Sequence, residues 1–544
     1  MPGADVPILI AGGGPVGLTL AAELARRGQS CLLVEQRTAP TEHPKATLLG
    51  ARSMEFYRRW GIADAIYDHA INQDLPYYIV FTTRLAGREL FRFRSPSIAE
   101  TRAHAPETLA RFRELNWSPY GKTQIGQQAL EPILIEYARA QSKLDLRHGW
   151  VLKHFEQHAD HVEALIEEEA TGRSENVRAA YLVGCDGGTS QVRRQLGVRY
   201  HGRGKMRANV SFFFRSAEFL AAHDRGVANL YFVFSPDSFG VFTAIDGAEL
   251  WNYQYYFLDP AKATETLDPQ AILHRAMGKP FDFELLAVQH WHHHQSVAAS
   301  WRDRRVFLAG DAAHLFVPTG GVGMNTGIGD AFDLAWKLDA TLSGWGGDAL
   351  LSSYEIERKP IAIRNSILSA SNSDRIDMAM GETPADIDEA DETTRAELAR
   401  KIKLLSRQFN SAGVHLGYRY VDSPIILGDG APEPPDDPTQ VSQSSWPGCR
   451  APHAWLADGR SMLDLFGEGF VLLRFGPERE GDATLLSAAG AIPVRLEDVC
   501  DDAAAALYER RLVLVRPDGH VAWRGEEAPE DCAALWARVT GHNL

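Results

Sequence analysis

The chain has 544 residues, of which 45% are hydrophobic and 23% charged, so it is an ordinary globular protein with room for roughly two to four domains of about 150 residues each. Its formal net charge of -15 and the lack of any Lys/Arg-rich block argue against a nucleic-acid partner. Its five cysteines form no C-x-x-C pair, which argues against a disulfide framework and for a reducing compartment, expected to be the cytoplasm.

The apolar N-terminal segment VPILIAGGGPVGLTLAAELA predicts a strand, a glycine turn and a helix. Its glycines, and the absence of a basic region before it, argue against a signal peptide or a membrane span, so no membrane partner is expected. Gly12, Gly14 and Gly17 form a G-x-G-x-x-G turn, and Glu35 ends the following strand, CLLVE. Such a turn admits a pyrophosphate at the helix N-terminus, and the acid accepts hydrogen bonds from a ribose. The pattern predicts a dinucleotide site for NAD or FAD rather than NADP, with a purely structural glycine turn as the alternative.

Residues 180–197 read AYLVGCDGGTSQVRRQLG, which predicts an apolar strand, a turn at Asp186 and a helix that carries Ser190 and Arg193. A plain turn and helix cap would also account for Asp186 and Ser190. The sequence alone leaves both interpretations open.

Alternating aromatic residues between this motif and residue 300 predict strands. Trp251, Tyr253, Tyr255 and Phe257 would share one face, which is either the lining of a pocket for an aromatic ligand or simple core. Arg215, in FFFRS, is a candidate anchor for a carboxylate. The run HWHHH at 290–294 places three histidines on one strand face, but no carboxylate or cysteine completes a ligand set, so no metal is expected.

Residues 305–338 predict a strand that delivers Gly310 and Asp311 into a second glycine loop, PTGGVGMNTG, followed by a helix. The helix has an apolar face, with Asp330 and Asp333 early and Lys337 late, as the helix dipole prefers. Its N-terminus therefore points into the glycine loop. A loop that needs its glycines only for packing is the alternative.

The C-terminal third begins after the proline-rich acidic linker APEPPDDPTQVSQSS. GFVLLRF, AIPVRL and RLVLV predict strands, and Pro517, Asp518 and Gly519 predict a hairpin turn. These segments indicate a separate unit.

Three stretches, GGGPVG with Glu35, CDGGTSQVR and GDAAHLFVPTGGVGMNTGIGDAFDLAWKL, resemble in order and spacing the signature stretches of the FAD-dependent aromatic hydroxylases. These are the single-component flavoprotein monooxygenases that include para-hydroxybenzoate hydroxylase and the phenol hydroxylases. The resemblance covers roughly residues 5–375. The last 99 residues, 446–544, resemble the thioredoxin-like tail of the phenol hydroxylase branch; without C-x-x-C, we interpret this tail as a structural domain or as the contact of a homodimer.

The resemblance assigns cofactor-binding residues one by one. For the ADP half of FAD these are Gly12, Gly14, Pro15, Val16, Gly17 and Glu35, with Arg52 near the pyrophosphate and Leu152 at the adenine. Gln127 and Asp311 would contact the ribityl chain, Asp186 would serve both FAD and the nicotinamide cofactor, and the flavin ring would lie against Gly321, Val322, Gly323, Met324 and Asn325. In that loop, backbone N–H groups would stabilise the negative charge that the reduced ring carries.

On the substrate side, the resemblance places the carbonyl of Pro318 near the substrate hydroxyl and His314 near the pocket. Together with Arg215 and Tyr253, these are the candidate substrate-binding residues. The sequence identifies no catalytic acid or base.

The expected fold class is α/β. A Rossmann-type FAD-binding domain (1–200, completed by 300–375) would be interleaved with a mixed β-sheet substrate domain (201–299, with part of 80–125). A helical segment (376–427), a linker (428–445) and the thioredoxin-like domain (446–544) would follow.

The expected function is hydroxylation of a small phenolic substrate next to an existing hydroxyl, with FAD, O2 and NADH or NADPH, through a C4a-hydroperoxyflavin. Only one G-x-G-x-x-G is present, so the reductant would bind transiently without its own Rossmann domain. The alternatives are Baeyer-Villiger or quinone-forming oxygenation of an aromatic polyketide, an FAD-dependent dehydrogenase, and a flavin-binding chaperone or sensor.

Overall fold

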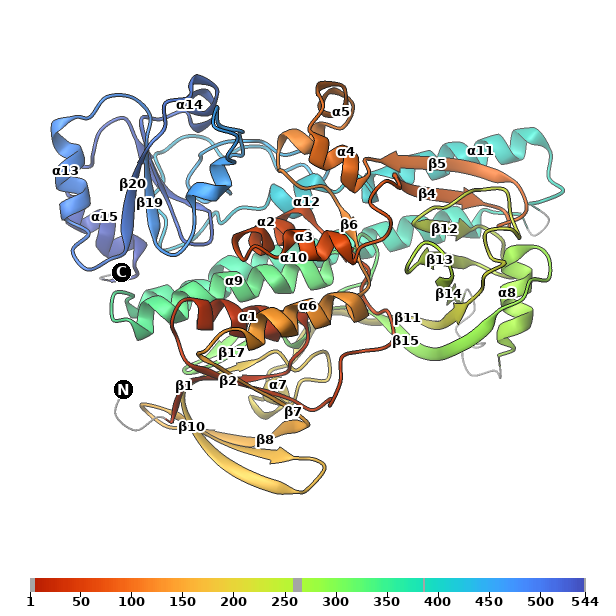
Figure 1. Ribbon diagram of the computed structural model, residues 1–544, viewed down its shortest axis with the longest axis horizontal. Coiled ribbons are helices and arrows are strands. Elements are labelled where there is room, and N and C mark those ends of the chain that lie inside the picture. Colours follow the sequence, from red (N-terminus) through yellow and green to blue (C-terminus); the bar gives the residue numbers. More distant parts are fainter. Residues whose placement is uncertain (1–4, 258–266, 385–386, 543–544) are drawn as a thin grey trace.

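A computed structural model describes residues 5–257, 267–384 and 387–542. Two large sheets and a smaller C-terminal one are joined by two long central helices (Figure 1). The class is α/β, as predicted. Across the described residues, no helix combines the length and the apolar character needed to cross a membrane.

The first sheet carries the N-terminal glycine turn. Its parallel strands, in spatial order, are β17 (Val306–Leu308), β10 (Arg173–Gly184), β1 (Val6–Ala11), β2 (Cys31–Glu35) and β7 (Leu144–His148). β16 (Arg302–Asp303) borders β17, and the hairpin of β8 (Trp150–Gln157) and β9 (Val162–Glu168) pairs with β10. The apolar run of β2 is buried throughout, as expected for a parallel strand covered on both faces. The hydrophobic core around the first sheet also includes α1 (Pro15–Arg26).

The second sheet is mixed and mostly antiparallel. Its order is β18 (His314–Leu315), β15 (Glu284–Ala298), β11 (Tyr200–Arg215), β14 (Leu250–Tyr256), β13 (Gly240–Ala244), β12 (Leu230–Val233), β4 (Tyr77–Thr82) and β5 (Glu89–Ser95). One face packs into an aromatic core with α8 (Pro269–Met277). On the other face, β4, β12, β13 and β14 pack with α10 (Asp348–Gly381) and α11 (Glu392–Leu404).

Two helices connect these sheets to the C-terminal unit. α9 (Gly323–Leu342) packs against α1, and α10 follows it as a continuous helix of 34 residues, shown in green and cyan in Figure 1. The predicted boundary at residue 375 therefore falls inside α10 and needs correction, because the helix continues from the first core into the core beside the second sheet.

The short elements around these layers are β3 (Leu48–Leu49), α2 (Ala51–Arg59), α3 (Ala63–Asp68), α4 (Ile98–Ala103), α5 (Pro106–Arg111), η1 (Arg113–Asn116), β6 (Thr123–Gln124), α6 (Gln127–Arg139), α7 (Gln191–Gln195), η3 (Gly310–Ala312), η4 (Leu405–Gln408) and α12 (Ala412–Leu416). β3 and β6 pair as a two-stranded sheet.

The C-terminal unit (blue in Figure 1) follows a stretch, 428–445, without helix or extended strand. Its sheet has the order β20 (Val494–Asp498), β19 (Phe470–Arg474), β21 (Leu512–Val515) and β22 (Val521–Gly525). β19 and β20 are parallel and the other pairs antiparallel, an arrangement typical of a thioredoxin fold. Its helices are η5 (Met462–Leu465), α13 (Glu480–Ser487), α14 (Asp502–Tyr508) and α15 (Cys532–Val539).

Candidate functional site

One cavity of about 810 Å³ lies where the first sheet, the second glycine loop and the second sheet meet. The residues lining it come from all three predicted motifs. Those that the sequence singled out are Gly12, Gly14, Pro15, Val16, Glu35, Gln127, Leu152, Asp186, Asp311, Pro318, Gly321, Gly323 and Met324. The structure therefore brings together segments up to about 300 residues apart in sequence.

The first glycine turn forms one wall. Gly12 has a positive φ of 103°, and a Cβ there would lie 2.3 Å from the carbonyl oxygen of Cys185. Gly17 does not line the cavity; a Cβ on it would lie 1.9 Å from the Gly12 carbonyl, so this glycine lets α1 pack closely. A Cβ at Gly14 would meet nothing within 4 Å, so the backbone there is open to a ligand. The N-terminus of α1 then offers free N–H groups to an anion.

Glu35 lies beside this turn and is almost fully buried. Its carboxylate accepts hydrogen bonds from the Gly13 N–H at 2.6 Å and from the backbone N–H and Nε of Arg37, both at 2.9 Å. Arg37 and Lys45 also line the cavity. Sequence reasoning missed these two cations, because neither belongs to a motif.

Asp186 both caps a helix and faces the cavity. Its Oδ2 accepts from the N–H groups of Gln191 and Val192 at 2.7 and 3.0 Å, at the start of α7. Its Oδ1 is buried without a partner among the described residues. The cap interpretation and the ligand interpretation therefore each account for one oxygen of the same carboxylate.

Asp311 projects into the cavity from the tight turn η3. Gly310 begins this turn with a φ of 61°. Although the side chain is open to the cavity, protein surrounds its other sides and this desolvation raises the pKa of Asp311 above its usual value; His314 and Lys45 oppose the shift. A ligand that donates hydrogen bonds to this carboxylate would lower its pKa again.

The second glycine loop ends at Gly323, where α9 begins without a side-chain cap. The first N–H groups of this helix therefore face the loop and the cavity. Asn325 and Val322 do not line the cavity, and their assignment as direct contacts of the ring stays a prediction. Instead, Asn325 Oδ1 accepts from Gly50 N–H and Ser53 Oγ, both at 2.7 Å, and its Nδ2 donates to the carbonyls of Leu48 and Gly321. Asn325 thus holds the loop in place.

Three charged side chains of α9 lie in the protein interior. Asp330, Asp333 and Lys337 are all buried and not solvent-facing. Asp330 accepts hydrogen bonds from His314 Nε2 at 2.8 Å, Arg358 Nε at 2.9 Å and Gly310 N–H at 3.2 Å. This carboxylate therefore fixes the turn that presents Asp311.

Four residues assigned to ligands are directed elsewhere. Arg52 donates to Glu55 and to the carbonyl of Asp518 in the C-terminal unit and does not line the cavity, so its place near the pyrophosphate stays a prediction. His314 is fully buried against Asp330, away from the cavity. Arg215 is at the surface and pairs with exposed Glu284. Neither residue lines the cavity, and a substrate-binding role for His314 or Arg215 stays a prediction.

Tyr253 is the fourth of these residues. It is buried in the aromatic core of the second sheet, where its hydroxyl donates to the carbonyl of Ser238. Because neighbouring strand residues point to opposite faces, Gln254 and Tyr256 line the cavity instead. The core interpretation of the predicted aromatic face therefore holds for Tyr253 and Trp251, and the cavity lies against the other face of the sheet.

The second sheet gives the cavity an extended aromatic and apolar wall. The residues of this wall are Tyr77, Ile79, Leu230, Phe232, Val241, Thr243, Gln254, Tyr256, Trp291, His292 and His294, joined by Ile376, Gln408, Phe409 and Lys122. Burial and nearby Lys205 lower the pKa of His292 and of His294, so both rings are neutral at pH 7.

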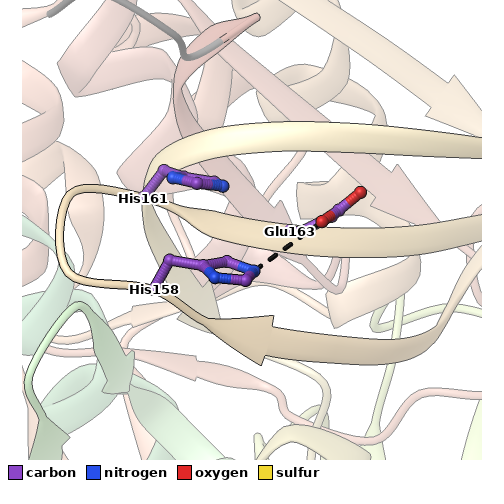
Figure 2. Close-up of side chains that lie close together, drawn as sticks. All are labelled: His158, His161 and Glu163. Atoms are coloured by element: carbon purple, nitrogen blue, oxygen red, sulfur yellow. Dashed lines mark ion pairs between the residues drawn. The ribbon is translucent and has the colours of Figure 1, made fainter.

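Among the described residues, one group of side chains has metal-like spacing, and it lies away from the cavity. His158, His161 and Glu163 sit at the turn between β8 and β9 (Figure 2). His158 Nε2 is 3.7 Å from Glu163. His161 is bound to Asp160 through Nδ1 and is 3.3 Å from an Arg178 nitrogen through Nε2. The Arg178 cation disfavours a metal at that nitrogen.

Comparison with known proteins identifies the scaffold. Residues 5–366 match the family model described as FAD binding domain, and residues 444–542 match the one described as aromatic-ring hydroxylase, C-terminal. The FAD-dependent monooxygenase apdD of Emericella nidulans is 32% identical, with 98% of this chain and 90% of the relative covered. The aklavinone 12-hydroxylase RdmE of Streptomyces purpurascens is also 32% identical, with 97% of each chain covered.

Among solved structures, the rebeccamycin biosynthetic enzyme RebC with reduced flavin is 37% identical and matches with a TM-score of 0.87, over 98% of this chain and 99% of that one. The open backbone at Gly14 and the Oδ1 of Asp186, which has no partner among the described residues, are suited to binding FAD. The chain belongs to the FAD-dependent aromatic-ring hydroxylase family and is a flavin-dependent monooxygenase.

Proposed function

We propose that this flavoprotein monooxygenase hydroxylates a fused-ring aromatic compound of the polyketide type, using O2 and either NADH or NADPH. The observation that carries the proposal is the continuity of the cavity, which runs from the FAD motifs to the aromatic wall of the second sheet. The same cavity, of about 810 Å³, would hold both FAD and the substrate. A relative that acts on aklavinone agrees with a large, flat substrate.

Particular residues would hold FAD. The turn at Gly12 and Gly14 would take the pyrophosphate, Glu35 the ribose, and Asp311 the ribityl hydroxyls, while the N–H groups at the start of α9 would face the flavin ring. Bound FAD supplies the redox chemistry by accepting a hydride and activating O2. The protein's contribution is binding, orientation and a water-poor environment.

The aromatic wall would orient the substrate and keep water away from it. Phe232 and Ile79, on neighbouring strands β12 and β4, form an apolar surface against which a flat ring system can lie. Phe232 stacks on Phe81 at 4.8 Å with an interplanar angle of 7°, which fixes its ring. Pro318 lines the cavity at the flavin end of this wall, so the substrate edge nearest Pro318 is the edge we expect to be oxygenated.

The test follows oxidation of the nicotinamide and incorporation of 18O from 18O2 into the product. Purified holoenzyme is given NADH or NADPH and a panel of phenols, hydroxybenzoates, naphthols and hydroxyanthraquinones, and oxidation of the nicotinamide is followed with and without each compound. We expect stimulation by the fused-ring compounds and incorporation of one 18O atom from 18O2 into a hydroxylated product. A ring-expanded lactone, identified by NMR, would instead indicate Baeyer-Villiger oxygenation. Turnover under nitrogen without 18O incorporation would overturn the proposal in favour of a dehydrogenase.

A further inference from the structure

The charged residues lining the cavity fall into two groups. Glu35, Asp186 and Asp311 line the part formed by the FAD motifs, together with cations such as Arg37 and Lys45. The part formed by the second sheet is different. Among the described residues that line it, no carboxylate is present, and Lys122 is the one side chain charged at neutral pH.

Lys122 is placed at this wall by the short sheet of β3 and β6. It directly precedes Thr123, which pairs with Leu49. Its ammonium group donates to the backbone carbonyl of Phe409, whose ring lies 5.9 Å from that of Phe232 on the sheet. Lys122 is therefore anchored beside the surface on which an aromatic ring system would lie.

No carboxylate of the described residues forms an ion pair with Lys122, and the Phe409 carbonyl uses only one of its three N–H donors. Burial lowers the pKa of Lys122 to about 8, against a small opposing effect of Glu114. Its ammonium is therefore still charged at pH 7 and lacks a counter-ion. A charge in a partly buried cavity wall without an ion-pair partner is unfavourable, and a ligand that brings the opposite charge relieves it.

Gln408 supplies a second, independent signal at the same place. Its side chain is only 4% exposed, lines the cavity and precedes the residue whose carbonyl binds Lys122. Neither its amide nitrogen nor its amide oxygen has a partner among the described residues. A buried amide without partners is rare in folded proteins, and one that faces a cavity is suited to a ligand.

We propose that Lys122 and Gln408 form a subsite that binds an anionic oxygen of the aromatic substrate, an aryl carboxylate or an ionised ring hydroxyl. The inference rests on the proposed function, since it names the substrate class for the same cavity. Lys122 contributes charge and Gln408 an N–H donor, a combination that recognises an oxygen anion and discriminates against the neutral ring.

Binding without turnover tests this subsite. Three ring-matched probes, 3-hydroxy-2-naphthoic acid, ionised 2-hydroxy-1,4-naphthoquinone and neutral 2-naphthol, are titrated at pH 7 into FAD-loaded protein, and the dissociation constants are obtained by calorimetry. We expect at least one acidic probe to bind about tenfold more tightly than 2-naphthol, with the first two distinguishing a carboxylate from an ionised hydroxyl. Lys122→Met should abolish that preference while changing 2-naphthol binding less than about twofold, and Lys122→Arg should retain it.

Lys143→Met, at an exposed lysine outside the cavity, is the matched control and should behave as wild type. Gln408→Leu should weaken the acidic probes selectively but less than Lys122→Met does. Equal affinity of wild type for all three probes, or an acid preference that survives Lys122→Met, would overturn the subsite. Because no turnover is required, failure of the 18O experiment would leave this result interpretable on its own.

Discussion

Arg516 Nη1 lies 2.5 Å from Glu357 Oε1, and both side chains are fully buried. Arg516 belongs to the C-terminal unit, at the end of β21, and Glu357 to α10. Asp333 of α9 and Asp518 complete the set around the same guanidinium at 3.1 and 2.6 Å. The C-terminal unit is thus docked on the two central helices through charge, and the first of these helices, α9, begins at the second glycine loop.

Replacement of Arg516 tests this docking. Arg516→Met would leave Glu357, Asp333 and Asp518 buried with Lys337 as their remaining close cation among the described residues. Breaking a buried ion pair on one side costs about 3–5 kcal/mol, so denaturant unfolding followed by tryptophan fluorescence should show a clearly lower midpoint. Arg510→Met is the control, because Arg510 is 38% exposed and its carboxylate partners are 3.9 Å away. Matching midpoints for the two variants would contradict the docking role.

Asp311 offers a direct test of the cofactor site. Asp311→Ala removes the carboxylate that projects into the cavity from η3, so the purified variant should be colourless and inactive. The measurement is the FAD content per polypeptide from absorbance after gel filtration. Asp303→Ala, at an exposed position of β16, should keep its yellow colour. A yellow, active Asp311→Ala enzyme would overturn the assignment of this residue.

Local backbone geometry explains which parts of the site the sequence could reveal. Gly12 and Gly310 lie at turns that need a positive φ, and each follows a strand, so residue type and position encode the geometry. Asp186 and Asp311 were visible for the same reason, since each comes at the end of a strand in a glycine-containing turn.

Long-range packing explains what the sequence could not reveal. Tyr253 and Tyr256 both fit an aromatic strand, and the alternation does not reveal that one face packs against α8 while the other lies beside α10, α11 and the cavity. Lys337 shows the same pattern as a solvent-exposed lysine near a helix C-terminus, because nothing in the sequence of α9 indicates that the C-terminal unit covers it. Arg52 likewise contacts that unit, because it donates a hydrogen bond to the carbonyl of Asp518. The contacts with the C-terminal unit join residues more than a hundred positions apart and leave no local pattern.

Glu55 makes stability depend on acidic pH in a predictable direction. It is 3% exposed and accepts hydrogen bonds from Arg450 Nε and Arg52 Nη1, each at 2.9 Å. Burial alone would raise the pKa of Glu55, but Arg450 and Arg52 together lower it to about 2 from its ordinary 4.5. A lowered folded-state pKa means that the stabilisation is present above pH 4.5 and is lost as the pH falls from there toward 2.

The free energy of unfolding at pH 6 and at pH 3 therefore separates wild type from Glu55→Gln. Wild type should lose about 2 kcal/mol more than the variant between pH 6 and pH 3, because over this range the unfolded wild-type chain takes up a proton at Glu55 and the folded protein largely does not. Glu107→Gln, at an exposed position of α5, should follow wild type. Parallel acid losses in wild type and Glu55→Gln would show that Glu55 is not held ionised by the two arginines.

Substitutions at Gly321 and Gly323 of the second glycine loop measure the effect of backbone strain separately from the effect of cofactor contact. Gly321 has a φ of 64°, and a Cβ there would lie 2.6 Å from Leu48 Cδ2. Gly321→Ala should therefore destabilise even the FAD-free protein, by about 1–2 kcal/mol from the left-handed backbone alone. At Gly323 the nearest atom to an added Cβ is Phe316 Cδ2 at 3.8 Å, an ordinary contact, and alanine favours the helix that begins there.

Gly323→Ala should consequently leave the stability of the FAD-free protein unchanged or slightly higher. Its methyl group would nevertheless enter the cavity where the flavin ring is expected, so FAD affinity should fall in both variants. Thermal unfolding of the two FAD-free proteins and fluorescence titration with FAD measure the two effects separately. If Gly323→Ala binds FAD as tightly as wild type, the ring does not approach the start of α9, and the free N–H groups of that helix do not stabilise it.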